Sequence, residues 1–317
     1  MIFFQTRCLP ESHTVTNIAK VLREAVDEWS LYPNPPLVSD NASNMFVAAK
    51  QFETELHLGS FAHTLNLACG KALKLPTASR LLARMRRVVS YFHRITTAAT
   101  ILKDKQTLLQ LPDNKLTIDV STRWNSALDM ISRFLEQQPA IYAALTSREL
   151  RGKEKDVTTL SESEITAAEE LVVVLSPLKT ATTALCKESV PTVSLIIPLQ
   201  YQLVTNILQE KDNDTELIKA VKKAIVEDLS ARYQNQDTRK ELVLSLLLDP
   251  RFKLAPFLTE QEKMEAYYDL TVNRAISVLQ AQSDKVKVKT QKEEPTYSPT
   301  DYTSNPSTVP PLPLLPK

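Results

Sequence analysis

The sequence predicts an α/β fold that is mostly helical, and three observations carry that prediction. Short β-prone runs alternate with helical stretches in the first part of the chain, which is typical of mixed α/β structure. Beyond Trp124 the spacing of apolar residues is almost wholly helical. From residue 283 onward Lys, Glu, Pro, Ser and Thr dominate, a composition that does not support a packed core.

The chain opens with a strand candidate at residues 2–4, Ile-Phe-Phe, and a helix is expected over residues 14–31. That helix is predicted by apolar residues that share one helical face: Ile18, Leu22, Ala25, Val26 and Trp29. Prolines end it after Tyr32, and a short strand is expected at residues 37–39. Residues 40–43, Asp-Asn-Ala-Ser, are typical of the start of the next helix.

Further along, one helix is expected from residue 63 and another over residues 79–110, followed by a strand at residues 116–120. Later prolines fall where helices begin or end, namely Pro191, Pro198 and Pro250, whereas Pro177 is expected to kink or interrupt its helix. We therefore expect three parts. They are an α/β region at 1–135, an all-helical domain at 136–282, and a disordered proline-rich tail at 283–317.

Composition excludes several classes of protein. Only 3 glycines stand against 19 prolines, so the glycine-rich phosphate loops of many nucleotide-dependent enzymes are absent. Cys8, Cys69 and Cys186 lie far apart, which excludes a disulfide framework and a CxxC zinc site and favours a reducing compartment. No apolar run approaches the ~18 residues of a membrane span, so no membrane partner is expected. The net charge of +1 means that nucleic-acid binding must come from a local cluster.

Two residues in the first part are candidates for chemistry. Asp40 follows a predicted strand and precedes a predicted helix, where a carboxylate could hold a metal ion. The alternative, which the residues alone favour, is that Asp40 or Ser43 caps the helix. His63 is surrounded by Leu65, Leu67 and Ala68, and a histidine in such a stretch is more often a packing residue than a ligand.

The stretch from Lys71 to Lys105 contains nine basic residues against one acid, Asp104. Four arginines fall on one helical face, where they could meet successive phosphates of a nucleic acid: Arg80, Arg84, Arg87 and Arg94. The alternative is a solvated basic helix that acidic residues from elsewhere compensate, with four candidates: Glu162, Glu164, Glu169 and Glu170. The sequence leaves both open.

Trp124 follows Arg123 between a predicted strand and a predicted helix. A tryptophan in this position is most often a core residue. It could also stack on an unpaired base, with Arg123 on the nucleic-acid backbone, because stacking on an aromatic ring tolerates any base.

Four ordered motifs resemble those of the hAT-superfamily transposases and their domesticated relatives with BED zinc fingers. They are LVSDNASNM, FAHTLNLA, VSTRWNS with the following SALDMISRFLEQ, and LLLDPRFK. The resemblance covers roughly residues 3 to 270. It implies an incomplete ribonuclease H-like α/β domain that an all-helical insertion interrupts.

The resemblance also implies roles for particular residues. Asp40 matches the second acid of the family's Asp-Asp-Glu metal site, His63 the histidine of its Cys-x-x-His motif, and Trp124 the tryptophan that stacks on a flipped base. Ser60 stands where the family has the cysteine. The first aspartate is expected upstream of this chain, and no glutamate can be assigned as the third acid.

From these departures we expect a domesticated, non-catalytic nuclear protein that binds DNA, protein partners or both in transcription or chromatin. Asp40 is then a vestigial catalytic residue that is inactive alone. No cofactor is expected, because the ancestral Mg²⁺ site is incomplete and the BED zinc finger is missing, and the family's dimerisation segment is also missing. Two alternatives stay open: SUMO-protein ligase activity, which a BED-finger relative implies, and a truncated transposase fragment without function.

Overall fold

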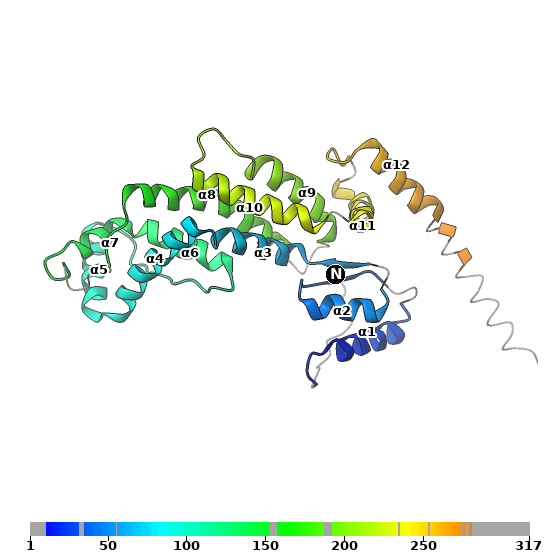
Figure 1. Cartoon of the computed structure of the whole chain (residues 1–317), viewed down its shortest axis with the longest axis horizontal. Coiled ribbons are helices and arrows are strands. Elements are labelled where there is room, and N and C mark those ends of the chain that lie inside the picture. Colours follow the sequence, from blue (N-terminus) through cyan, green and yellow to red (C-terminus); the bar gives the residue numbers. More distant parts are fainter. Residues whose placement is uncertain are drawn as a thin grey trace, which may run out of the picture. The chain divides into compact units, whose positions relative to one another are not determined.

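The computed structural model describes residues 11–31, 35–54, 56–151, 157–186, 192–233, 235–252, 254–273, 275–276 and 279–280. Its contacts divide the chain into two units, residues 1–266 and 267–317. The elements are β1 (Leu37–Ser39), β2 (His57–Gly59), α1 (Val15–Trp29), α2 (Ser43–Phe52), α3 (Phe61–Leu73), α4 (Pro76–Arg94), α5 (Thr96–Leu108), α6 (Trp124–Glu136), α7 (Gln138–Leu145), α8 (Glu162–Leu185), α9 (Ile196–Gln202), α10 (Glu216–Arg232), α11 (Gln236–Leu247) and α12 (Glu260–Tyr268). The prediction of a mostly helical fold is confirmed (Figure 1).

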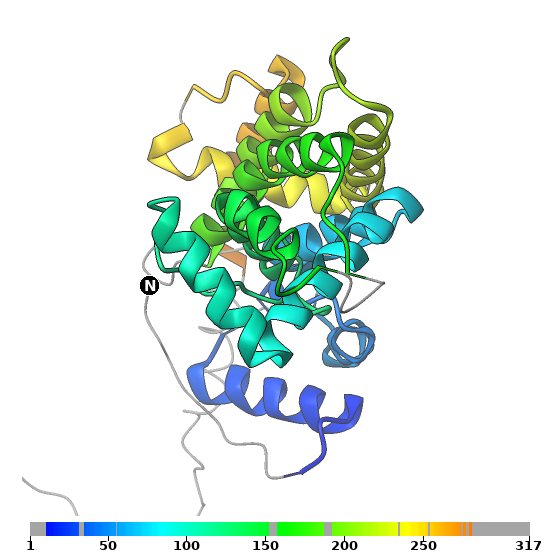
Figure 2. The same ribbon diagram turned by 90° about the vertical axis from the view of Figure 1, so that its left-hand side faces the viewer.

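The described strands form a two-stranded parallel sheet in which Leu37 pairs with His57 and Ser39 with Gly59. Helix α2 is the crossover between the two strands, as parallel pairing requires. Helix α1 packs on α2, buries Ala19 and Val26, and lies at the periphery of the first unit (Figure 2). The helix predicted at 14–31 and the strand predicted at 37–39 are confirmed, whereas the strand candidate at residues 2–4 lies outside the described residues.

The core of the first unit lies among α3, α6, α8 and α10, which pack against one another. Helix α3 contributes Leu65, Ala68 and Cys69, all fully buried, and α8 contributes Leu171 and Leu178 on the facing side. Burial raises the pKa of the Cys69 thiol, which therefore stays protonated in this apolar setting. Helix α4 packs against α3 and α6 of this bundle, and α5 packs against α4.

The single helix predicted over 79–110 is two helices in the structure, because Ile95 interrupts it. The backbone of Ile95 is extended, with φ −105° and ψ 104°, and this residue caps the end of α4 and the start of α5. Ile95, Thr96 and Thr97 form a β-branched run, and such residues lose side-chain freedom in a helix. The prediction was therefore right in type but wrong in continuity.

The strand predicted at residues 116–120 is wrong, because no strand lies beside it in the described structure. Side chains of neighbouring helices form hydrogen bonds with the backbone of this segment instead. His93 donates from Nε2 to the Leu116 carbonyl oxygen at 2.8 Å, and the Ser126 hydroxyl bonds both the amide and the carbonyl of Val120 at 2.8 and 3.0 Å. Leu116 is buried and anchors this irregular segment, whereas the β-prone residues Ile118 and Val120 are exposed.

Pro177 does not interrupt its helix, contrary to one of the two outcomes expected, since α8 runs from Glu162 to Leu185 through it. Proline removes one helical donor, and the carbonyl left without it belongs to Val173, which is 72% exposed and open to water. Buried residues on either side, Val174 and Leu178, hold the helix against the bundle.

Two of the other prolines stand at element starts, as predicted: Pro198 lies in the first turn of α9, and Pro250 begins a 3₁₀ turn at Pro250–Phe252. Pro191 and the tail at 283–317 lie outside the described residues. The boundary predicted between residues 135 and 136 falls within the last turn of α6, one residue before its end, and the division into domains stays a prediction. Among the helices described, none has the length and apolar character needed to cross a membrane.

Candidate nucleic-acid interface

Helix α4 presents the arginines that the sequence singled out. Pro76 occupies its first turn, where the missing amide hydrogen costs nothing. One face of the helix is buried through Leu82, Met85 and Val89, which orients the opposite face outward. Arg80, Arg87 and Arg94 are exposed on that face, and Arg84 is half-buried among them.

Arg80 and Arg87 are two of the exposed members of this set. Arg80 donates from Nε to the Pro76 carbonyl oxygen of its own helix at 3.2 Å. In the part of the chain that the structure describes, no acidic side chain pairs with Arg80 or Arg87. These two guanidinium groups are therefore open to an external anion.

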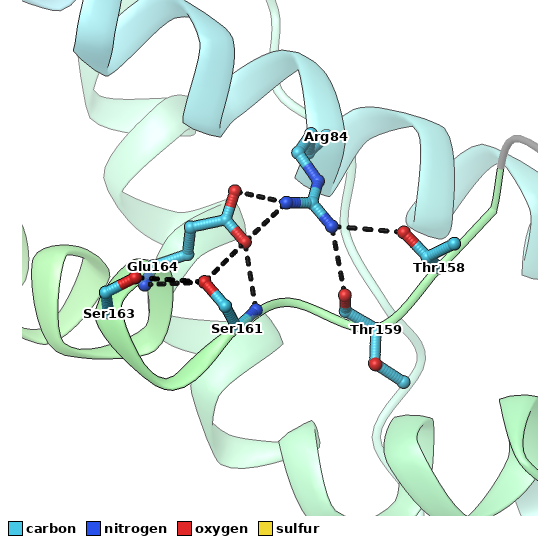
Figure 3. A network of polar contacts seen from close by, with 6 residues as sticks. All are labelled: Arg84, Thr158, Thr159, Ser161, Ser163 and Glu164. Atoms are coloured by element: carbon cyan, nitrogen blue, oxygen red, sulfur yellow. Dashed lines mark hydrogen bonds and ion pairs between the residues drawn. The ribbon is translucent and has the colours of Figure 1, made fainter.

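Arg84 differs, because its guanidinium contacts Glu164 at the start of α8 and two residues of the segment that precedes this helix (Figure 3). Nη1 pairs with both carboxylate oxygens of Glu164. Nη2 donates to the Thr158 hydroxyl at 3.1 Å and to the Thr159 carbonyl oxygen at 3.0 Å. Glu164 is one of the four acids that the sequence offered as compensating charges.

Glu164 also closes a capping box at the start of α8. Its Oε2 accepts hydrogen bonds from the Ser161 amide at 2.9 Å and from the Ser161 hydroxyl at 3.0 Å. Burial raises the pKa of Glu164, but the hydrogen bonds from Ser161 and Arg84 outweigh it and leave the pKa below its ordinary value. Glu164 is consequently ionised at neutral pH.

Three other basic residues of the stretch pair with acids within the fold. Arg86 forms a bidentate pair with Asp119, at 2.7 and 2.6 Å to its two carboxylate oxygens, on the other side of α4. Lys71 lies 3.6 Å from Asp228, and Lys103 lies 3.0 Å from Asp113. Acids therefore compensate several of these charges, whereas Arg80 and Arg87 pair with no acidic side chain in the described structure, and nucleic-acid binding stays a prediction.

The segment around Trp124 is built as a helix start. The Ser126 hydroxyl shares its single proton between the Val120 and Arg123 carbonyl oxygens, at 3.0 and 2.6 Å, and Arg123 is exposed. Trp124 itself is only 4% exposed, so its ring belongs to the core and neither face is free to stack on a base in this conformation. Its Nε1 and the neighbouring Asn125 Oδ1 are buried without a hydrogen-bond partner in the described structure.

The Asp40 carboxylate lies at the end of β1 and is exposed. Its Oδ1 accepts a hydrogen bond from the Ala42 amide at 3.2 Å. The N-cap residue of α2 is Ala42, with no side-chain cap, so neither Asp40 nor Ser43 is the capping residue in the strict sense. Among the residues described, no three His, Cys, Asp or Glu side chains converge on a possible metal position, so the described donors do not fit a metal centre.

His63 lies partly buried on α3, and its role as a packing residue stays a prediction. The sequence analysis overlooked another histidine, His57 on β2. Its Nε2 lies 2.8 Å from the Ser39 hydroxyl, its ring meets Phe46 edge to face at 4.6 Å, and its Nδ1 is buried without a partner in the described structure. The run Leu56-His57-Leu58-Gly59 before a helix was the available signal, because it repeats the strand-to-helix pattern of residues 37–43.

Two comparisons place the chain among known proteins. Residues 58–173 match the family described as the ZBED1 RNase-like helical domain, a range that includes α4 and the start of α8. The chain is also similar to human zinc finger BED domain-containing protein 4, with 26% identity over 230 residues. That alignment covers 71% of this chain and 18% of the relative's length.

Proposed function

From these similarities we propose that this chain is a ZBED-like relative of the hAT transposases, and that it is a nuclear protein that binds the backbone of DNA without cutting it. The four sequence motifs and the match of residues 58–173 support the same ancestry. The proposed contact surface is the outward face of α4, which lies inside the matched range.

The exposure of Arg80 and Arg87 is the observation that carries this proposal. They stand seven positions apart on one helix face, which corresponds to about 10 Å along the axis, so both can reach phosphates of one duplex. Guanidinium groups bind phosphate oxygens through paired, charge-assisted hydrogen bonds. Contacts of this kind position a protein on DNA but carry no base information, so we expect binding that depends little on sequence.

Fluorescence anisotropy with a fluorescein-labelled duplex of about 20 base pairs tests the proposal. We expect the double variant Arg80→Glu and Arg87→Glu to weaken binding roughly tenfold or more, and to lower the slope of log K against log salt by about 2. The control is Lys50→Glu with Lys223→Glu, which makes the same change of net charge on exposed residues of α2 and α10. Equal weakening by both double variants would contradict a specific role of α4.

The absence of cutting is proposed because two-metal strand transfer needs several converging carboxylates, and Asp40 is exposed and bonded to a backbone amide. A supercoiled plasmid incubated with the protein and Mg²⁺ or Mn²⁺ tests this. We expect wild type and Asp40→Asn to leave the plasmid equally intact. Nicking by wild type that Asp40→Asn removes would overturn this part of the proposal.

We also propose that β1, α2 and β2 belong to a ribonuclease H-like sheet. The parallel register and the helical crossover support this ancestry. A crystal structure of the protein in which these elements do not superpose on a ribonuclease H-type sheet would argue against it.

Nuclear localisation is tested by imaging the tagged chain, for which cytoplasmic retention is the contrary result.

A further inference from the structure

The central arginine of the α4 face is not available in the free chain. Arg84 stands between Arg80 and Arg87 in sequence and on the same face, but Glu164 of α8 occupies its Nη1. The two residues are 80 positions apart in the chain, so this pairing is a product of the tertiary fold. Both Glu164 oxygens lie on the single nitrogen Nη1, so the carboxylate occupies the donor that a phosphate oxygen would use.

Arg84 stays in position independently of Glu164. Its Nη2 bonds to Thr158 and Thr159 hold the guanidinium at 3.1 and 3.0 Å from their oxygens. Replacement of Glu164 by another anion would therefore leave the side chain in place, and the entropy cost of ordering it is already met.

Glu164 in turn does not depend on Arg84 for its hydrogen bonds. The Ser161 amide and hydroxyl both bond to its Oε2, at 2.9 and 3.0 Å, within the capping box. A Glu164 carboxylate that lost Arg84 would keep these partners and its partial exposure to water. Side-chain exposures of 34% for Arg84 and 24% for Glu164 give an incoming phosphate access to the pair.

We propose that Glu164 is an internal competitor for Arg84, and that a phosphate of the nucleic acid displaces it when DNA binds to α4. This inference rests on the proposed function. It makes Arg84 a third phosphate contact that is masked in the free chain, and it makes Glu164 the residue that sets the affinity of the surface. Loss of the Glu164 charge should then unmask Arg84.

The test compares Glu164→Gln with Glu162→Gln in the anisotropy assay. Glutamine at position 164 can keep the capping box, so the helix start is preserved while the charge is lost. Glu162 is the exposed first residue of α8 and makes no bond to Arg84, so its replacement removes the same charge nearby without unmasking the arginine. Circular dichroism melting checks that both variants fold like wild type.

We expect Glu164→Gln to bind the duplex roughly five- to tenfold more tightly than wild type and to steepen the salt slope by about 1, the value for one added phosphate contact. Glu162→Gln should tighten binding less and leave the slope unchanged. Arg84→Gln should cancel the gain in the Glu164→Gln background but have a smaller effect in wild type, where DNA must first displace Glu164.

The outcomes separate this inference from the function on which it rests. If wild type binds DNA through Arg80 and Arg87 but the two Glu→Gln variants behave alike, the competition is overturned and the proposed function stands. If neither wild type nor Glu164→Gln binds the duplex even at low salt, both are overturned.

Discussion

The Tyr233 hydroxyl donates a hydrogen bond of 3.1 Å to the Gly59 carbonyl oxygen and so joins two residues 174 positions apart. Because the tyrosine has a single hydroxyl proton, Thr64 is the donor in their 3.3 Å contact, and Thr64 in turn accepts from Asn41 Nδ2 at 3.0 Å. This chain of bonds connects the end of β2, the start of α3, the turn after β1 and the end of α10.

Removal of the Tyr233 hydroxyl tests how much this series of hydrogen bonds contributes to the free energy of unfolding. Burial raises the pKa of Tyr233, so the hydroxyl stays protonated and remains a donor at every physiological pH. We expect Tyr233→Phe to lower the free energy of unfolding by about 1–2 kcal/mol, because the Gly59 carbonyl loses a partner in a part-buried site. Urea denaturation measures this, and Tyr142→Phe, at a 53% exposed position, is the control that should change little.

We expect the substitution of glycine by alanine to have opposite effects on stability at Gly59 and Gly70. A Cβ on Gly59 would lie 1.8 Å from Asn41 Oδ1, so Gly59→Ala must displace Asn41 and its bond to Thr64, at a cost of about 1–3 kcal/mol. A Cβ on Gly70, inside α3, meets nothing within 4 Å, and alanine there should stabilise the helix by roughly 0.5–1 kcal/mol. Thermal unfolding of both variants checks this; a lower melting temperature for Gly70→Ala would contradict it.

His57 should make stability fall on mild acidification. Burial lowers its pKa from the ordinary value of 6.5, so the unfolded chain takes up a proton before the folded one does. Stability is then complete above about pH 7 and declines as the pH falls through 6.5 toward the lower pKa of the folded state. Urea midpoints measured from about pH 7.5 to 5.5 test this. His57→Gln should flatten the decline, and an unchanged slope in that variant would assign the decline to another group.

Asp249 should control stability at lower pH. Hydrogen bonds from Arg251, with further bonds from Ser194 and the Arg251 amide, hold the pKa of this carboxyl well below its usual range although burial opposes them. Because the folded pKa is depressed, the stabilisation is present above about pH 4 and is lost as the pH falls below it. Ser194 donates to Asp249 Oδ2 at 2.6 Å, and Asp249→Asn should cost about 1–3 kcal/mol at neutral pH.

The measurement for Asp249 is the unfolding free energy of wild type and Asp249→Asn from about pH 6 to 3. Wild type should lose stability over this range faster than the variant does, so the two curves converge. Curves that stay parallel would show that Asp249 is not the group responsible.

Local sequence features predicted much of the fold and part of the candidate site. The apolar spacing from Ile18 to Trp29 predicted α1, and the run Leu37-Val38-Ser39 predicted β1, because both signals depend on residues that are close in the chain. The same spacing placed Arg80, Arg84 and Arg87 on one face of α4. The strand predicted at 116–120 was wrong because a strand needs a neighbour, and side chains such as His93 and Ser126 supplied the hydrogen bonds instead.

The sequence by itself determined where several of the helices form, that α4 carries a basic face, and that the chain resembles the hAT transposases. Only the tertiary structure decided that Glu164, among four candidate acids, pairs with Arg84, that Trp124 is a core residue, and that Tyr233 reaches Gly59. The physical reason is distance along the chain. Periodicity reports backbone geometry over a few turns, whereas the partner of a charge or a hydroxyl is set by which distant segments pack together.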